Sequence, residues 1–289
     1  VNTNVVETET IPLDVSTDNE VVVENEATTT AATGENNASS TSETEITTGD
    51  AYASANVLSV VNLNLVESNG FLYLLNNFLQ SLGHIDLRLF SSPETPPDNP
   101  CGTPSCDDFA SSLSVEATNQ AEISNALITR SSTGNNSATG GQSSIATGNA
   151  FAGANLVNIA NTNIINSNYL LFAFNNFGGW DGDLIFPNSF FFSSFFSQSS
   201  TEGAEVSDTN SANVESEVEV LAETGGNEAE GEGAVIGSGD ALAGANVSNI
   251  VNTNLFNTSN FFVVFRIFGS WNGSVFNAPE GIEWAETPS

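Results

Sequence analysis

The chain contains the stretch TGDAYASANV at residues 48–57, which recurs as TGNAFAGANL at residues 147–156 and as SGDALAGANV at residues 238–247. Each copy leads within a few residues into an Asn-rich triplet, NLN at 62–64 and NTN at 161–163 and 252–254. Equivalent blocks in the same order at long spacing are the signature of a tandem repeat protein. The sequence therefore predicts three copies of one structural unit.

The repeats extend on both sides of these blocks. Upstream, Val15, Val115 and Val206 open equivalent stretches, and downstream FGGWDG at 177–182 answers FGSWNG at 268–273. We assign residues 13–110 to the first unit, which includes a Pro/Cys loop, residues 111–203 to the second and residues 204–289 to the third. Residues 1–12 precede the first unit as a separate N-terminal strand.

The residue pattern within a unit predicts an all-β fold. Small and polar residues alternate with a period of two, as expected of strands that pack closely on one face. Gly, Asn, Ser and Thr crowd every candidate helical window. Two architectures fit: β-solenoid-like layers with aromatic hairpins, which we favour, and three tandem β-sandwiches. In the first, residues 169–174 are expected to pair with residues 184–186 as an aromatic hairpin.

Composition excludes several classes of function. The 35 Asp and Glu side chains against three Lys and Arg give a formal charge of −32. Such a surface repels nucleic acid and anionic lipid. Hydrophobic residues make up 39% of the chain, including 20 Phe, which is enough to bury a core. No apolar run approaches the roughly 18 residues that a transmembrane helix needs.

The two cysteines indicate an oxidising compartment. Cys101 and Cys106 lie in one Pro-rich loop, where a local disulfide is the first interpretation and free thiols the second. We therefore expect an extracellular or cell-surface protein.

The sequence offers no catalytic or cofactor motif. With a single His, a multi-histidine metal site is impossible, and the many carboxylates read best as a solvated strand face rather than an acid–base pair. Turn carboxylates and amides are candidate calcium ligands, although the same residue types simply suit turns. These candidates are Asp50, Asn149, Asp240, Asp181 and Asp183.

Two apolar segments are candidate contacts between subunits. The stretch FFFSSFF at 190–196 is too apolar for an exposed loop, so its phenylalanines are expected either to pack in the core or to contact a partner. The first residues, VNTNVV, repeat the VNTNLF of 251–256, which suggests a strand donated to a neighbouring copy. The predicted contact residues are Val1, Val5, Val6, Ile11, Phe190, Phe191, Phe192, Phe195 and Phe196.

The linked pattern Thr-Gly-Asp/Asn-Ala, Asn-Thr-Asn and Phe-Gly-x-Trp resembles repeats in uncharacterised secreted surface proteins of candidate-phyla-type bacteria. This resemblance implies a cell-surface setting and no activity. Together the observations predict an extracellular structural protein, not an enzyme, whose copies assemble into a filament or surface layer by β-strand addition. The first alternative is a monomeric adhesin stalk or carbohydrate-binding module that meets cell-surface glycans. The second is a secreted hydrolase with an acidic pair.

Overall fold

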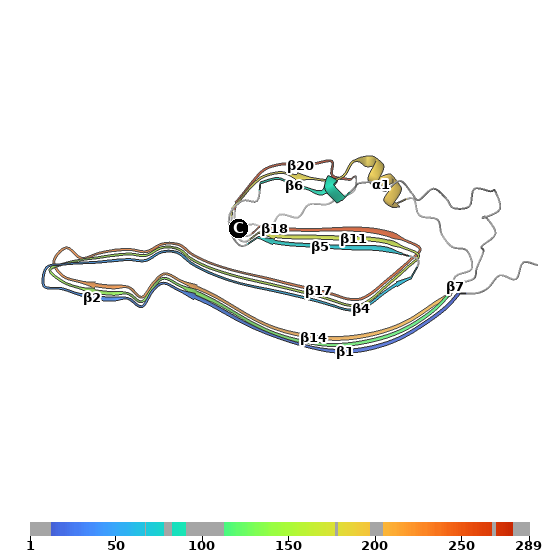
Figure 1. Cartoon of the computed structure of the whole chain (residues 1–289), viewed down its shortest axis with the longest axis horizontal. Helices are drawn as coiled ribbons and strands as arrows, with labels where there is room; N and C mark the ends of the chain where they lie inside the picture. Colours follow the sequence, from blue (N-terminus) through green and yellow to red (C-terminus); the bar gives the residue numbers. More distant parts are fainter. Residues whose placement is uncertain are drawn as a thin grey trace, which may run out of the picture.

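The protein is a stack of three long rungs, each formed by one repeat (Figure 1). The computed structural model describes residues 13–66, 68–77, 83–90, 113–176, 179–196, 205–267 and 270–279. Each rung runs out along one long strand, turns back through short strands, returns along a second long strand and folds back again along a third (Figure 1).

The elements follow the same order in every rung. The first rung holds β1 (Leu13–Ala32), β2 (Asn37–Ser39), β3 (Glu43–Thr47), β4 (Ala51–Val66), β5 (Asn69–Asn77), β6 (Ile85–Asp86) and the 3-10 helix η1 (Leu87–Phe90). The second holds β7 (Leu113–Ser132), β8 (Ser137–Thr139), β9 (Gln142–Ala146), β10 (Ala150–Ile165), β11 (Asn168–Asn176), β12 (Trp180–Asp181), β13 (Leu184–Ile185) and α1 (Ser189–Phe196). The third holds β14 (Glu205–Glu223), β15 (Glu228–Glu230), β16 (Val235–Gly237), β17 (Ala241–Phe256), β18 (Ser259–Ile267), β19 (Trp271–Asn272) and β20 (Val275–Phe276).

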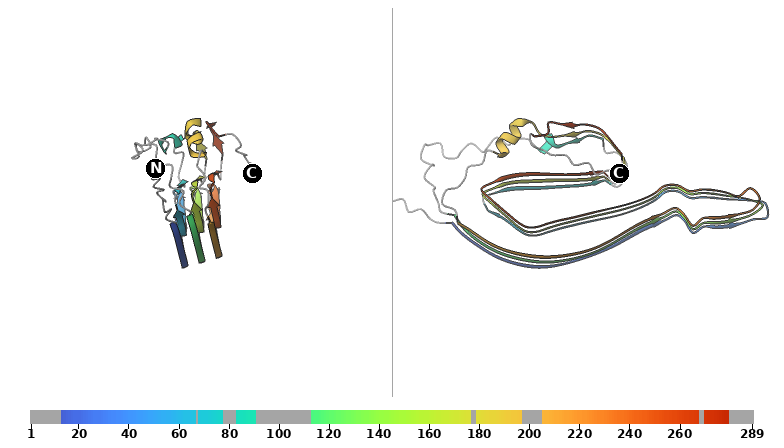
Figure 2. Two further views of the ribbon diagram at one scale, coloured as in Figure 1. Left: turned by 90° about the vertical axis from the view of Figure 1, so that its right-hand side faces the viewer. Right: turned by 180° about the vertical axis from the view of Figure 1, so that it is seen from behind.

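Every strand pairs with its own counterpart in the neighbouring rung. The pairing is parallel and in register: Ala51 lies beside Ala150, which lies beside Ala241. Six of the described sheets have three strands, with the middle repeat always in the centre, as in β1-β7-β14 and β17-β10-β4. Figure 2 shows the three rungs edge-on, as blue, green and orange strands side by side. The predicted solenoid-like layering of three tandem repeats is confirmed.

Two finer expectations are wrong. Separate β-sandwiches would pair strands within a repeat, whereas each long strand here pairs with the equivalent strand of another repeat. The predicted aromatic hairpin fails for the same reason, since β11 pairs with β5 and β18, and β13 pairs with β6 and β20. One complete repeat makes one coil of the solenoid.

Apolar side chains fill the space between one long sheet and the next. Leu127 of β7 packs with Ala154 and Leu156 of β10, which joins the first long sheet to the second. Ile159 and Ile164 of β10 pack with Tyr169 and Leu171 on the far side, which joins the second sheet to the third. β10 is therefore covered on both faces and on both edges, and all sixteen of its residues are buried. Parallel sheets of this kind normally need such cover on both faces.

An aromatic cluster lies where β11 and β18 end and β12 and β19 follow. Trp180 and Trp271 stack with ring centroids 5.5 Å apart, and Phe174 and Phe265 pack against them. α1 adds Phe192 to this cluster. Among the described residues no helix is long and apolar enough to cross a membrane.

Candidate functional site: the two outer faces of the stack

The stack has two outer faces that none of the described strands covers. The first-rung face consists of the free edges of β1 to β6, and the third-rung face of the free edges of β14 to β20. Among the described residues, these strands form backbone strand pairs with the middle rung alone. Each face thus presents rows of backbone N–H and C=O groups along its whole length.

These edges are long and carry few of the features that block strand addition. β1 has 20 residues, β14 has 19, and β4 and β17 have 16 each. Soluble proteins usually protect such edges with short strands, bulges, proline or inward-pointing charges, because an open edge is a template for another chain. The described edge strands contain no proline.

Ladders of asparagine run through the stack from one outer face to the other. The Asn62 amide donates to Asn161 Oδ1 at 2.9 Å, and the Asn161 amide donates to Asn252 Oδ1 at 2.9 Å. An amide has both donors and acceptors, so identical copies in register satisfy one another in a buried position. A second, zigzag ladder links the first two long sheets through Asn19, Asn64, Asn119, Asn163, Asn210 and Asn254.

The first of these ladders, Asn62–Asn161–Asn252, is called the corner ladder below because it also fixes a bend of the backbone. Asn62, Asn161 and Asn252 have φ values of 51°, 53° and 55°, in the left-handed region that Asn tolerates better than most residues. Asn62 and Asn161 each donate a second bond to a carbonyl of the next rung, at Gln120 and Ser211 respectively. The ladder therefore ends in an amide donor, Asn252, on the third-rung face.

Glycine columns mark places where the rungs approach too closely for a side chain. A Cβ on Gly34 would lie 1.9 Å from the Gly134 carbonyl oxygen, and one on Gly134 would lie 1.9 Å from that of Gly225. In a second column the direction is opposite: a Cβ on Gly239 would lie 2.4 Å from the Gly148 oxygen, and one on Gly148 would meet Gly49. A Cβ on Gly225 or Gly49, at the two outer ends, would have nothing within 4 Å.

Acidic side chains are never direct neighbours across a strand pair in the described part of the chain. Where both outer rungs carry an acid, the middle rung carries a neutral residue between them. This holds for Asp14–Ser114–Glu205, Glu24–Ser124–Glu215, Glu26–Ala126–Glu217 and Asp50–Asn149–Asp240. Like charges directly opposite destabilise a sheet, so the middle rung acts as a spacer.

One polar pair is incomplete within the molecule. Thr17 on β1 and Asp208 on β14 align with Ala117 on β7, which separates them. Thr17 Oγ1 and Asp208 Oδ1 are both buried without a hydrogen-bond partner among the described residues, and desolvation raises the pKa of Asp208. A buried polar atom without a partner costs about 1–3 kcal/mol.

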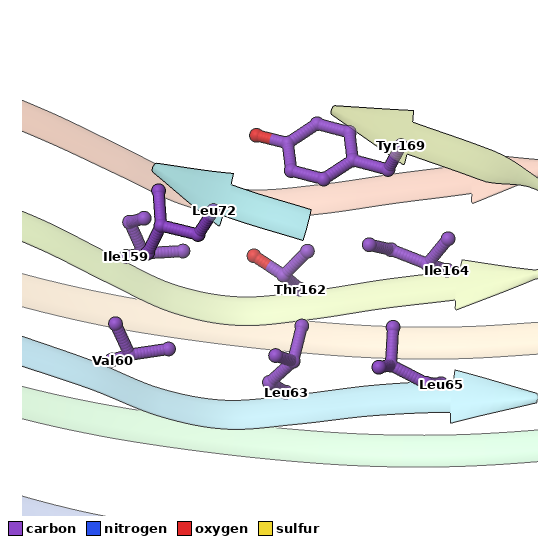
Figure 3. Close-up of a pocket in the computed structure, with 8 residues that line it drawn as sticks. All are labelled: Val60, Leu63, Leu65, Leu72, Ile159, Thr162, Ile164 and Tyr169. Carbon is purple, nitrogen blue, oxygen red and sulfur yellow. The ribbon is translucent and has the colours of Figure 1, made fainter. Parts of the chain in front are cut away.

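An apolar cavity opens beside the first-rung face. It has an empty volume of about 420 Å³, open solvent at its mouth included, and lies between the second and third long sheets (Figure 3). Val60, Leu63 and Leu65 of β4 line it and are each 39–45% exposed. Ile159 and Ile164, their counterparts in the middle rung, are almost fully buried because a third strand covers them.

The predicted calcium ligands take part in turn columns. Asp50 Oδ1 accepts the Asn149 backbone N–H at 2.6 Å, and Asn149 Oδ1 accepts the Asp240 N–H at 2.8 Å. Asp183 likewise accepts the Ser274 N–H, and its second oxygen lies 3.0 Å from His84. Asp181 lies nearby in β12. The described residues hold no group of three or more His, Cys, Asp or Glu side chains that could hold a metal ion.

The predicted phenylalanine contacts divide into two groups. Phe192 is buried against Phe261, with ring centroids 5.1 Å apart, and Phe191 is partly buried beside it. Phe190 and Phe196 are 72% and 48% exposed. Phe195 lies between, and its carbonyl accepts the Asn168 amide at 2.9 Å.

Other predicted site residues lie outside the described residues. These are Cys101 and Cys106 of the expected disulfide, and Val1, Val5, Val6 and Ile11 of the expected donated strand. Sequence reasoning did not identify the two outer faces as a site, although the aligned glycines and asparagines were its visible signal.

No family model, curated protein or solved structure matches this chain. The resemblance to bacterial surface repeats therefore stays a prediction, and the geometry of the two outer faces is the observation that bears on function.

Proposed function

We propose that this protein is an extracellular structural subunit whose copies join into filaments by β-strand addition. The observation that carries the proposal is the pair of long, open strand edges on the first-rung and third-rung faces. Repeat proteins whose terminal repeats lack a polar cap expose such edges to further stacking.

The middle rung illustrates what a covered rung gains. β10 is buried at every position. Its counterparts in the outer rungs are not: exposed residues alternate with buried ones along much of β4, and β17 begins with several exposed residues in a row. Leu58, Leu63 and Leu65 on one face and Val247 and Phe256 on the other are more than a third exposed. Stacking copies would convert both outer rungs into middle rungs and remove this apolar surface from water.

The acidic side chains support filaments over sheets or bundles. Glu24, Glu26, Glu215, Glu217 and Glu219 are all exposed, on the solvent side of the first long sheet. Negative charge on that flank repels neighbouring filaments, while the edges of β4 and β17 consist largely of Asn, Ala and aliphatic residues and carry no acid. The cell-surface setting rests on the resemblance of the repeats and on the disulfide expected between Cys101 and Cys106.

Electron microscopy of the purified chain tests the proposal directly. We expect unbranched filaments, and fibre diffraction with a strong reflection at about 4.7–4.8 Å along the fibre axis, the spacing of strands in a sheet. Single particles at every concentration, with a monomer mass by light scattering, would instead favour the monomeric adhesin stalk.

The N-terminal strand is a separate part of the proposal. If residues 1–12 supply the joint, their deletion abolishes filaments. If the open faces supply it, the truncated chain still polymerises, and strand donation by this segment is excluded.

A further inference from the structure

The geometry points to one specific joint between copies: the third-rung face of one molecule docks on the first-rung face of the next, in the same parallel register that joins the rungs inside the molecule. This inference rests on the proposed function and names the contact surface and its polarity.

The outermost glycines carry the first argument. Gly34 and Gly134 must be glycine because a Cβ there would clash with a backbone carbonyl of the following rung. Gly148 and Gly239 must be glycine because a Cβ there would clash with a backbone carbonyl of the preceding rung. Gly225 and Gly49 occupy the same two columns, yet no atom of the described residues lies within 4 Å of where their Cβ would be. Neither has a positive φ, so backbone conformation does not require glycine there.

The in-register joint explains why both positions are glycine. It would place a Gly225 Cβ against the Gly34 carbonyl of the next copy, and a Gly49 Cβ against the Gly239 carbonyl of the preceding copy. Both columns point to the same joint, although they run in opposite directions along the stack.

The unpartnered polar atoms carry the second argument. Within one molecule Thr17 and Asp208 lie two strands apart, with Ala117 between them. At the joint they would be adjacent, about 4.8 Å apart along the stack. The Thr17 hydroxyl could then donate to the Asp208 carboxylate, so each face would satisfy a buried atom left open on the other.

The asparagine ladders give the joint its direction. The corner ladder donates from Asn62 to Asn161 to Asn252, and the zigzag ladder ends in the donation from Asn210 to Asn254. Stacking third rung on first rung continues the corner ladder, with the Asn252 amide facing the Asn62 carbonyl of the next copy. Two first-rung faces, or two third-rung faces, would meet with their ladders opposed.

Two alanine substitutions test the joint without disturbing the single molecule. Gly225→Ala blocks the third-rung face and Gly49→Ala blocks the first-rung face. We expect each variant alone to fold like the parent chain, by circular dichroism and thermal unfolding, and to form no filaments.

Mixing the two variants gives the decisive result. Gly49→Ala keeps an intact third-rung face and Gly225→Ala keeps an intact first-rung face, so one joint forms and neither outer end can grow. We expect a one-to-one dimer by light scattering, at the concentration at which the parent chain polymerises, because each added subunit of a linear stack also forms one joint.

Gly237→Ala is the matched control. It lies on the same outer rung, a Cβ there would have nothing within 4 Å, and its neighbour in the middle rung, Ala146, already carries a Cβ. Filaments of this variant should match those of the parent chain.

Each alternative outcome is distinct. Filaments from Gly225→Ala or Gly49→Ala alone would overturn this register while leaving the filament function in place. Dimers from one variant alone would show a face pairing with its own kind and also overturn the register. A parent chain that stays monomeric would overturn the proposed function and the joint together.

Discussion

At the scale of single residues, the stack is specified by side chains that can sit beside copies of themselves. Asparagine satisfies its own neighbours, glycine permits close approach, and acids are separated by neutral residues. The asparagine series is plainly visible in the sequence, and the hydrogen bonds show that its members join equivalent positions of successive rungs. The acid spacers appear only once the register is known, since their partners lie about 100 residues away.

Substitutions of Asn161 can separate the two roles of the corner ladder, which are the amide hydrogen bonds and the left-handed backbone conformation. Asn161→Ala removes the amide and also forces a residue with a Cβ to keep a φ of 53°. Asn161→Gly removes the same amide but adopts that conformation freely. We expect the Ala variant to be less stable than the Gly variant by about 1–2 kcal/mol, measured as the difference in free energy of unfolding by urea. Equal stabilities would mean that the φ requirement contributes nothing.

Asp208 makes the stability of the unassembled molecule depend on pH. Because burial raises its folded pKa, the folded state holds a proton that the unfolded state has lost, and stability falls as pH rises through the range just above the usual Asp value of about 3.9. Asp208→Asn should remove this fall and raise the melting temperature at neutral pH.

Asp18→Asn on β1 serves as the control, since that side chain is exposed and faces Thr118. A pH profile unchanged in Asp208→Asn would contradict the assignment of this dependence to Asp208.

At the scale of elements, local sequence signals and long-range pairing disagree in informative places. Gly-Asn and Gly-Asp steps are typical of hairpins, but here they turn the chain between strands whose partners are other repeats. The aromatic hairpin expected from residues 169–186 fails because a strand of apolar residues can pair equally well with a neighbour or with its own copy. The pattern of one repeat alone cannot distinguish the two.

α1 is the element that the sequence did not predict. Eight residues are too few for a stable isolated helix, so tertiary contacts must hold it. Asn188 Oδ1 caps it by accepting the Phe191 N–H at 3.1 Å, and Phe192 anchors it against Phe261.

Phe192→Ala should therefore destabilise the molecule by about 3–5 kcal/mol, the usual cost of truncating a buried Phe. Phe190→Ala is the control, because that side chain is 72% exposed and should change the free energy of unfolding by less than about 0.5 kcal/mol. Chemical denaturation of the two variants measures both values. A small effect of Phe192→Ala would mean that α1 is not held by this contact.

At the scale of the whole molecule, three repeats suffice to define an inner rung and two outer ones. The threefold repeat and the layered all-β fold follow from the sequence, because equivalent blocks present equivalent pairing surfaces. The outer faces do not follow, since each depends on which rung happens to lack a neighbour. Equivalent residues are core in the middle repeat and less buried in the other two: Ile159 is buried, Ile250 is partly buried and Val60 is exposed.

Part of the net charge of −32 opposes this assembly at specific positions, where acids of adjoining copies would lie side by side. At the proposed joint the neutral spacer is missing, so Asp14, Glu24, Glu26 and Asp50 would each lie directly beside an acid of the neighbouring copy. Each such pair opposes association by about 0.2–1 kcal/mol. Salt shortens the screening length from about 10 Å at 0.1 M to about 3 Å at 1 M, so filament growth should begin at lower protein concentration as salt rises.

Replacing both Glu24 and Glu26 by Gln should have the same effect at low salt. The loss of two opposed pairs is expected to lower the critical concentration for polymerisation several-fold, measured by sedimentation of filaments at a series of protein concentrations. Glu116→Gln is the control, because Glu116 lies in the middle rung between Ser16 and Ser207 and faces no acid at the joint. It alters net charge without altering an opposed pair, so an equal effect of Glu116→Gln would assign the barrier to overall charge and remove the electrostatic support for this register.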